Sequence, residues 1–341
     1  MIRPLLAAFL WVLILGGCAP TEPTITTFVD EWRLLSAGPN GLATITMPTG
    51  IVANPSVWAG PDGTVFPVSK IKRFREDVYA LHSSLPWIII FDATTLAPKD
   101  TIDLGGNGVP FDITFPNATT AYVSLPTTNA VGIIDLTVGM VVATIDVGSK
   151  SAGIASAGNQ VCVALTSANE LAIIDTRTNL VETRLPTDPA PVYVDADGLN
   201  AVFCVVCLGS GKIDRENPTA PTIIFVSATS RTILKKLDIA GRPTNASLQL
   251  PRGLIVTANE YAFVPVQNGL VRVNTRTRNK VTVIQVDSYD AIAYNPARAE
   301  IILQRTLDGG TVYDVLDEFA ENTKASSVQA DSSSSIIGIG R

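Results

Sequence analysis

Short apolar runs separated by turn residues fill most of this chain, and one run recurs with a regular spacing. Each copy ends in an apolar or aromatic residue followed by a polar one, at Ile45-Thr46, Phe91-Asp92, Ile134-Asp135, Ile174-Asp175, Val226-Ser227, Val273-Asn274 and Tyr313-Asp314. Successive copies are on average about 45 residues apart, which is the spacing of four-stranded propeller blades. The pattern therefore predicts an all-β fold, a seven-bladed β-propeller of four-stranded antiparallel blades.

The clearest blade lies between residues 110 and 147. Its four β-rich runs, separated by turn residues, are 110–115, 121–125, 131–135 and 141–147. We expect the polar residue that ends the third run to accept backbone hydrogen bonds in the following turn. The aspartate is not present in every copy, since Ser227 and Asn274 replace it, and this argues against a shared catalytic role for the position.

The residues of two blades resemble a known repeat. The matching segments are Ala121-Tyr122-Val123, Asn129-Ala130-Val131, Ile133-Ile134-Asp135 and Thr144-Ile145-Asp146-Val147-Gly148. They are similar to the YVTN-type β-propeller repeat of bacterial and archaeal surface proteins. The resemblance is best over residues 105–188 and weaker elsewhere, and it implies the same propeller fold.

A propeller must close its ring, because an open stack leaves an unpaired strand edge and an exposed apolar face. The repeat spacing places an inner strand of the first blade near residues 24–29, which would complete that blade without help. The outer strand of the last blade is expected near 320–326, where the sequence is a poor strand former. Residues 336–339 are apolar enough to return and supply that outer edge.

The N-terminus predicts an exported, lipid-anchored protein. Arg3 precedes an apolar run that is too short to span a bilayer and ends in Leu15-Gly16-Gly17-Cys18. This sequence resembles a bacterial lipobox, which implies that Cys18 carries the lipid after cleavage. A plain secretory signal is the alternative. The expected parts are a signal peptide (1–18), a tether (19–23), one propeller domain (24–331), and a Ser-rich tail or ring-closing edge (332–341).

The same motif implies a location in the cell envelope. No aspartate follows Cys18 directly, so the sequence resembles lipoproteins sent to the outer membrane, facing the periplasm or the cell surface, where the cell has such a membrane. The predicted partners are thus the membrane itself and an envelope protein, peptide or glycan.

Charge argues against nucleic acid as a partner. Removing the signal leaves 24 basic residues against 31 acidic ones, and there is no basic cluster. Three cysteines remain, and two of them, Cys204 and Cys207, are three apart on one strand and should point to opposite faces. Buried free thiols are therefore favoured over a zinc site or a Cys204–Cys207 disulfide, with a bridge from Cys162 to one of the pair as the alternative.

Candidate functional residues fall into three groups. The longest loop, 209–221, is polar and is the candidate partner-binding segment, with Lys212, Asp214, Arg215 and Glu216 as contacts; a passive surface insertion is the alternative. The single histidine, His82, could pair with Ser83 or Ser84, although a structural role is favoured. Carboxylates and an amide near the inner strands could hold a metal, as in lactonase-like propellers: Asp112, Asp195, Asp197, Asn245 and Asp290.

Two functions remain open on the sequence alone. The first is a non-catalytic binding or scaffold module with no cofactor and no metal. The second is an envelope enzyme with a site in the channel, most plausibly a metal-assisted lactone or ester hydrolase. The sequence contains no phosphate-binding loop, dinucleotide fingerprint or nucleophile elbow. The binding module is the preferred interpretation.

Overall fold

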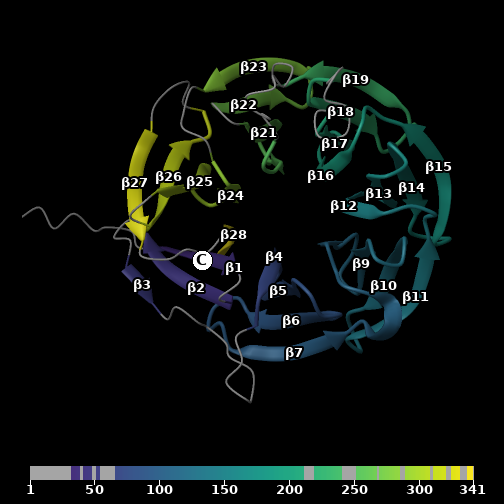
Figure 1. Cartoon of the computed structure of the whole chain (residues 1–341), viewed down its shortest axis with the longest axis horizontal. Helices are drawn as coiled ribbons and strands as arrows, with labels where there is room; N and C mark the ends of the chain where they lie inside the picture. The colour runs from purple at the N-terminus through teal and green to yellow at the C-terminus, as the bar shows by residue number, and fades with distance from the viewer. Residues whose placement is uncertain are drawn as a thin grey trace, which may run out of the picture. The chain divides into compact units, whose positions relative to one another are not determined.

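Six four-stranded antiparallel sheets, each built from four consecutive strands, make up most of the structure (Figure 1). This computed structural model describes residues 32–38, 41–47, 51–53, 66–210, 219–239, 251–266, 269–284, 289–307, 310–319, 324–330 and 336–340. All of them belong to one unit, Glu31–Arg341. The all-β propeller expected from the sequence is confirmed.

The first three blades along the chain are regular. The first contains β4 (Val68–Phe74), β5 (Asp77–His82), β6 (Trp87–Asp92) and β7 (Pro98–Asp103). The second contains β8 (Asp112–Thr114), β9 (Thr120–Leu125), β10 (Ala130–Asp135) and β11 (Met140–Asp146). The third contains β12 (Ser151–Ala157), β13 (Gln160–Leu165), β14 (Glu170–Asp175) and β15 (Leu180–Pro186). A short 3-10 turn, η1 (Gly105–Asn107), lies between β7 and β8 and so between the first blade and the second.

The next three blades repeat the scheme. They contain β16 (Pro191–Asp197), β17 (Val202–Cys207), β18 (Thr222–Ser227) and β19 (Ile233–Asp238); β20 (Ile255–Val256), β21 (Tyr261–Val266), β22 (Gly269–Asn274) and β23 (Asn279–Ile284); and β24 (Ala291–Asn295), β25 (Glu300–Leu307), β26 (Gly310–Asp317) and β27 (Lys324–Ala330). The described part of the chain contains no helix with the length and apolar character needed to cross a bilayer.

The remaining sheet joins the two ends of the chain, and we call it the closing sheet. Its strand order is β28-β1-β2-β3, made of β28 (Ile336–Gly340), β1 (Trp32–Gly38), β2 (Gly41–Met47) and β3 (Ile51–Ala53). β28 pairs antiparallel with β1, through Arg33 opposite Gly340 and Leu34 opposite Ile339. The innermost position of this sheet is therefore filled from the C-terminal end.

The prediction of seven blades is wrong for blades folded from four consecutive strands. Six blades are built that way, and the last sheet is a composite that needs residues 336–340. This segment supplies an inner strand beside β1, whereas the sequence suggested an outer edge for the last blade; β27 already occupies that edge. The inner strand expected at 24–29 lies outside the described residues. The physical reason is that pairing both chain ends in one sheet removes the open edge.

Apolar side chains fill the space between neighbouring sheets. Among the described residues, each of the seven buried clusters draws on two adjacent sheets. One cluster joins Leu34 of the closing sheet to Tyr313 of the last blade, and another joins Leu35 to Ile71 of the first blade. The ring is therefore closed by apolar contact on both sides of the closing sheet.

Burial along the strands follows their position in the blade. The middle strands β13 and β17 are buried at every residue, whereas the outer strands β15 and β19 alternate between exposed and half-buried positions. Figure 1 shows the outer strands β7, β11, β15, β19, β23 and β27 along the rim. The inner strands therefore carry the side chains that can reach the centre.

The recurring polar residue has the predicted role in the turn. Asp135 Oδ1 accepts from the Thr137 backbone N–H at 2.8 Å, and Asn274 Oδ1 accepts from the Thr277 N–H at 2.7 Å. Ser227 Oγ accepts from the Ser230 N–H at 3.0 Å. Carboxylate, amide and hydroxyl oxygens all serve here, which explains why the residue type varies.

The sequence alignment of the last blade needs a correction. Asp314 is buried within β26, where its Oδ2 accepts from the Tyr289 hydroxyl at 2.8 Å. Asp317, three residues later, makes the turn contact instead, because its Oδ1 accepts from the Phe319 N–H at 2.7 Å. The register shift that precedes the motif falls at Val315/Leu316, as it falls at Ile133/Ile134 in the second blade. Structurally, the repeat position is therefore Asp317.

Candidate functional site

A cavity of about 930 Å³ lies among the inner strands, at the centre of the ring. It is bounded by residues 69–73 of β4, 193–195 of β16, 255–256 of β20 and 291–295 of β24, together with Phe111. Its walls combine apolar and charged side chains. The charged ones are Lys70, Lys72, Arg73, Arg75, Asp195, Arg252 and Asp290.

Two lysines of β4 share one buried carboxylate. Lys70 Nζ lies 2.7 Å from Asp112 Oδ2, and Lys72 Nζ lies 3.5 Å from Asp112 Oδ1. Alternate residues of a strand share a face, so both lysines point the same way, while Ile71 between them packs into an apolar cluster. The side chain of Asp112 is 1% exposed, whereas the lysines are 29% and 31% exposed. The carboxylate is buried, and the ammonium groups reach the cavity.

Asp112 is ionised in this setting. Burial favours the neutral acid, but the ammonium groups of Lys70 and Lys72 outweigh it and hold the pKa of Asp112 below its ordinary value. Its oxygens also accept from the backbone N–H of Ile113 at 2.8 Å and of Ile154 at 3.3 Å. Asp112 thus connects the first three blades through β4, β8 and β12.

Asp195 occupies a similar place on β16 with a different charge balance. Its Oδ2 accepts from the Val256 N–H at 2.8 Å, which connects β16 to β20, and its Oδ1 accepts from the Ala196 N–H at 2.9 Å. Burial raises the pKa of Asp195, and Lys72 only partly opposes this. The pKa values of the two aspartates are therefore shifted in opposite directions.

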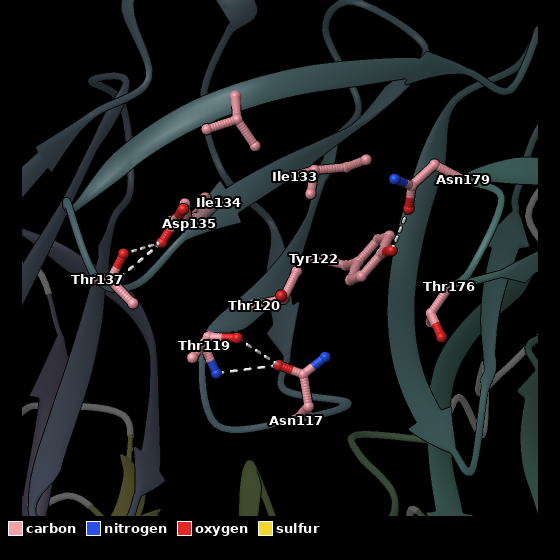
Figure 2. A pocket seen from close by; sticks show the side chains of 11 residues that line it. Asn117, Thr119, Thr120, Tyr122, Ile133, Ile134, Asp135, Thr137, Thr176 and Asn179 are labelled. Atoms are coloured by element: carbon pink, nitrogen blue, oxygen red, sulfur yellow. Dashed lines mark hydrogen bonds between the residues drawn. The ribbon is translucent and has the colours of Figure 1, made fainter.

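A second, smaller pocket of about 420 Å³ lies between the second and third blades, near their outer strands (Figure 2). Its polar side chains bond mainly to one another. Tyr122 donates its hydroxyl to Asn179 Oδ1, and Asn117 Oδ1 accepts from the Thr119 N–H at 2.9 Å. The first contact joins two blades and the second orders a turn, so these polar side chains of the pocket have structural roles.

His82 has a structural role. Its Nδ1 accepts from the backbone N–H groups of Ser84 at 3.0 Å and Leu85 at 2.9 Å, and the ring packs edge-on against Phe66 at 4.4 Å. Burial lowers the pKa of His82. The Ser84 hydroxyl is 3.5 Å from the same nitrogen, which is already occupied as an acceptor. The ring nitrogen facing Ser84 therefore cannot act as a free base, and the structural role favoured from sequence is confirmed.

The predicted binding loop is described only at its base. Lys212, Asp214, Arg215 and Glu216 lie outside the described residues. At the base, the Ser210 N–H donates to Thr219 Oγ1 and the Thr219 N–H donates to Ser210 Oγ, both at 2.9 Å. These two hydrogen bonds thus hold the two ends of the loop together where they leave the blade.

The carboxylates proposed as metal ligands have other partners. Asp112 pairs with two lysines, and Asp197 accepts from Thr275 Oγ1 and, at 2.8 Å, from Asn200 Nδ2. Asp290 is 3.6 Å from Arg252, and Asn245 lies outside the described residues. Within the ranges that the structure describes, no three histidine, cysteine or acidic side chains gather in an arrangement suited to a metal.

The three described cysteines are free and buried. Cys204 lies in the cluster between the fourth and fifth blades, while Cys207 and Cys162 lie in the cluster between the third and fourth. The expectation that Cys204 and Cys207 face opposite ways is confirmed. Burial raises the pKa of Cys207 to about 12, so its thiol is unreactive at neutral pH.

Sequence reasoning missed the basic strand β4. Its alternation of Lys70, Ile71 and Lys72 is the usual signature of a strand with one apolar and one polar face. Locating that strand on the inner side of a blade would have placed both lysines toward the channel.

Fold and cavity together define a β-propeller with a channel of ligand size. No family model matches the chain, and no curated protein matches it in sequence. Hydrazine synthase of Kuenenia stuttgartiensis is similar in structure, with a TM-score of 0.59 and 16% identity over 71% of this chain and 74% of that chain. The designed protein Ika8 has a TM-score of 0.63 and 12% identity over 89% and 86% of the two chains.

A chain of the mitotic checkpoint complex is also similar, with a TM-score of 0.61 and 13% identity over 80% and 83% of the two chains. Identities this low establish the fold alone. In all, 1351 solved chains share the likeness, so it does not select an activity.

Proposed function

We propose that this protein is a lipid-anchored β-propeller of the bacterial cell envelope that binds a protein, peptide or glycan partner without catalysing a reaction. The central cavity carries this proposal. Its volume of about 930 Å³ is within the range of about 300–1,000 Å³ common for ligand pockets. It combines apolar wall residues with a few charged groups, which is the usual composition of a binding site.

The hydrogen bonds around the cavity favour binding over catalysis. Asp112 and Asp195 each accept backbone hydrogen bonds that connect neighbouring blades. His82, which is not part of the cavity lining, accepts two backbone hydrogen bonds through Nδ1. Side chains bonded to the backbone in this way are held in a fixed position, which suits recognition of a ligand more than proton transfer.

The proposed location in the cell envelope depends on the N-terminal sequence. Leu15-Gly16-Gly17-Cys18 resembles a lipobox, and residues 19–23 would form the tether. Kinship with the YVTN-type surface propellers is part of the same proposal, supported by the repeat segments and by the turn contact of Asp135. One structural neighbour is a chain of the mitotic checkpoint complex, so this fold also serves in a protein assembly.

The anchor is tested by radiolabelled palmitate. The wild-type chain should incorporate label and Cys18→Ala should not. Equal labelling of both would remove the lipid anchor from the proposal.

The binding site is tested by filling the channel. Ser69 is exposed and lines the cavity, so Ser69→Trp should abolish binding of any peptide or glycan selected from an array with the wild-type protein. Thr229→Trp, at an exposed turn between β18 and β19, is the matched control and should bind normally. Binding unchanged by Ser69→Trp would place the site outside the channel.

Metal analysis of the purified protein tests the alternative function, a metal-assisted lactone or ester hydrolase. A stoichiometric Ca²⁺ or Zn²⁺ whose removal also abolishes an esterase activity would establish the hydrolase and overturn the binding module.

A further inference from the structure

The cavity is positively charged in a protein that is negatively charged overall. The whole chain has 25 basic and 31 acidic residues. The lining of the cavity reverses this balance, with five basic side chains against two acidic ones, Asp195 and Asp290. A cavity with low-dielectric walls strengthens the field of such an excess and draws in anions.

The excess is concentrated at Lys70 and Lys72. One carboxylate, Asp112, faces two ammonium groups, at 2.7 and 3.5 Å. Asp112 also accepts the backbone N–H of Ile113 and of Ile154, so its oxygens are shared among four donors. The more distant ammonium, that of Lys72, is therefore only partly neutralised and can take a further acceptor from the cavity.

Asp195 and Asp290 offset this charge only in part. Asp195 is partly buried and bonded to two backbone N–H groups. Asp290 is 3.6 Å from Arg252, so that pair contributes little net charge. With Arg73 and Arg75 also in the lining, basic side chains still outnumber acidic ones around the cavity.

Apolar side chains line the same space. Phe111, Tyr193, Ile255 and Ile292 are part of the wall. A bound inorganic ion would leave these apolar side chains exposed to water, whereas an apolar substituent on the ligand would cover them. The site thus combines a cationic end with a surface for a hydrocarbon or aromatic group.

We infer that the channel binds a small organic anion, with its carboxylate on Lys72 beside Lys70 and its apolar part against the wall formed by Ile255 and Ile292. This inference rests on the proposed binding function and names the chemical class of its ligand. A free metabolite and the carboxylate end of a short peptide share this chemistry.

The experiment is calorimetric titration of the purified full-length protein with four probes. They are 3-phenylpropionate, its neutral amide, acetate, and a dipeptide that ends in phenylalanine. We expect 3-phenylpropionate to bind at least about tenfold more tightly than the amide, because a hydrogen bond to a charged group is lost, and more tightly than acetate. Comparing the dipeptide with 3-phenylpropionate shows whether the site prefers the carboxylate end of a peptide or the carboxylate of a free metabolite.

Three variants locate the charge. Lys72→Gln should weaken 3-phenylpropionate binding about tenfold, and Lys72→Arg should retain it. Lys280→Gln removes the same charge from an exposed position on the outer strand β23 and should leave binding unchanged. Thermal melts of all three establish that they fold.

Several outcomes would overturn the inference. Equal binding of acid and amide, or no effect of Lys72→Gln, would refute recognition of an anion; if Ser69→Trp still abolished that binding, the channel would remain the binding site of the proposed function. Equal binding of acetate would refute the apolar half of the site. If neither carboxylate binds at millimolar concentration, the inference fails, and array ligands sensitive to Ser69→Trp then decide the proposed function separately.

Discussion

Gly153 should be among the least replaceable residues of the ring, because two blades touch there through their backbones. It lies on β12 against β16 of the next blade. A Cβ atom added at Gly153 would lie 2.4 Å from the Val192 carbonyl oxygen and 2.6 Å from the Val194 nitrogen. Gly153→Ala therefore cannot be accommodated by turning a side chain.

The size of the effect follows from that overlap. The two strands would have to separate by roughly 0.8 Å to restore a normal carbon–oxygen contact, in an interior packed at the density of a crystal. Overpacking of this kind costs about 1–3 kcal/mol. Ala152 and Val194 hold the two strands in one buried cluster, so we expect about 2–3 kcal/mol.

Gly198→Ala is the matched control. Gly198 follows β16 in the fourth blade, and a Cβ atom there would meet nothing within 4 Å. This substitution should be neutral or should stabilise by about 0.4–1 kcal/mol, because alanine restricts the unfolded chain. The two alanine variants should thus differ by about 3 kcal/mol.

Urea unfolding followed by far-UV circular dichroism measures this difference, with equal slopes for the three proteins. The melting temperature of Gly153→Ala should fall by about 4–10 °C. A Gly153→Ala variant as stable as Gly198→Ala would refute the close backbone approach of β12 and β16.

Two further predictions concern ring closure and the buried carboxylate. Deleting residues 332–341 removes β28 from its pairing with β1 and should lower the melting temperature by at least about 5 °C, while deleting Arg341 alone should not; an unchanged melt of the longer deletion would show that β28 is dispensable. Asp112→Asn should destabilise by about 1–3 kcal/mol at pH 7, less than a fully buried pair, because both lysines are partly exposed. The folded pKa of Asp112 lies below the unfolded value of about 4, so its stabilisation is complete above that pH and is lost as the pH falls through the folded pKa. Wild type and Asp112→Asn, unfolded in urea at pH 7 and at pH 3, should therefore differ less in stability at the lower pH, and a constant difference would contradict the ion pairs.

Local pattern predicted the repeating part of the fold. Asp92, Asp135, Asp175, Ser227 and Asn274 all end a third strand and accept hydrogen bonds in the turn that follows. The alternation of apolar and polar residues and the chemistry of turns depend on residues a few positions apart, so both can be predicted from the sequence. The opposite faces of Cys204 and Cys207 follow from the same strand period.

The same local pattern predicted the wrong motif position in the last blade. Tyr313-Asp314 resembles the motif, but β26 continues to Asp317, which takes the turn contact. Asp314 instead bonds the Tyr289 hydroxyl and Arg305 within the buried interior. A local match could not reveal this, because packing against distant residues decided which aspartate ends the strand.

By itself, the sequence determined an all-β propeller with four-stranded blades, the turn role of its recurring polar residue, and a predicted lipid anchor at Cys18. Only the tertiary structure decided that residues 336–340 pair with β1, and that Lys70, Lys72 and Asp112 meet beside a central cavity. Strand period and turn chemistry depend on neighbours in sequence. Ring closure and channel charge depend on residues that are far apart along the chain and meet only when the blades pack.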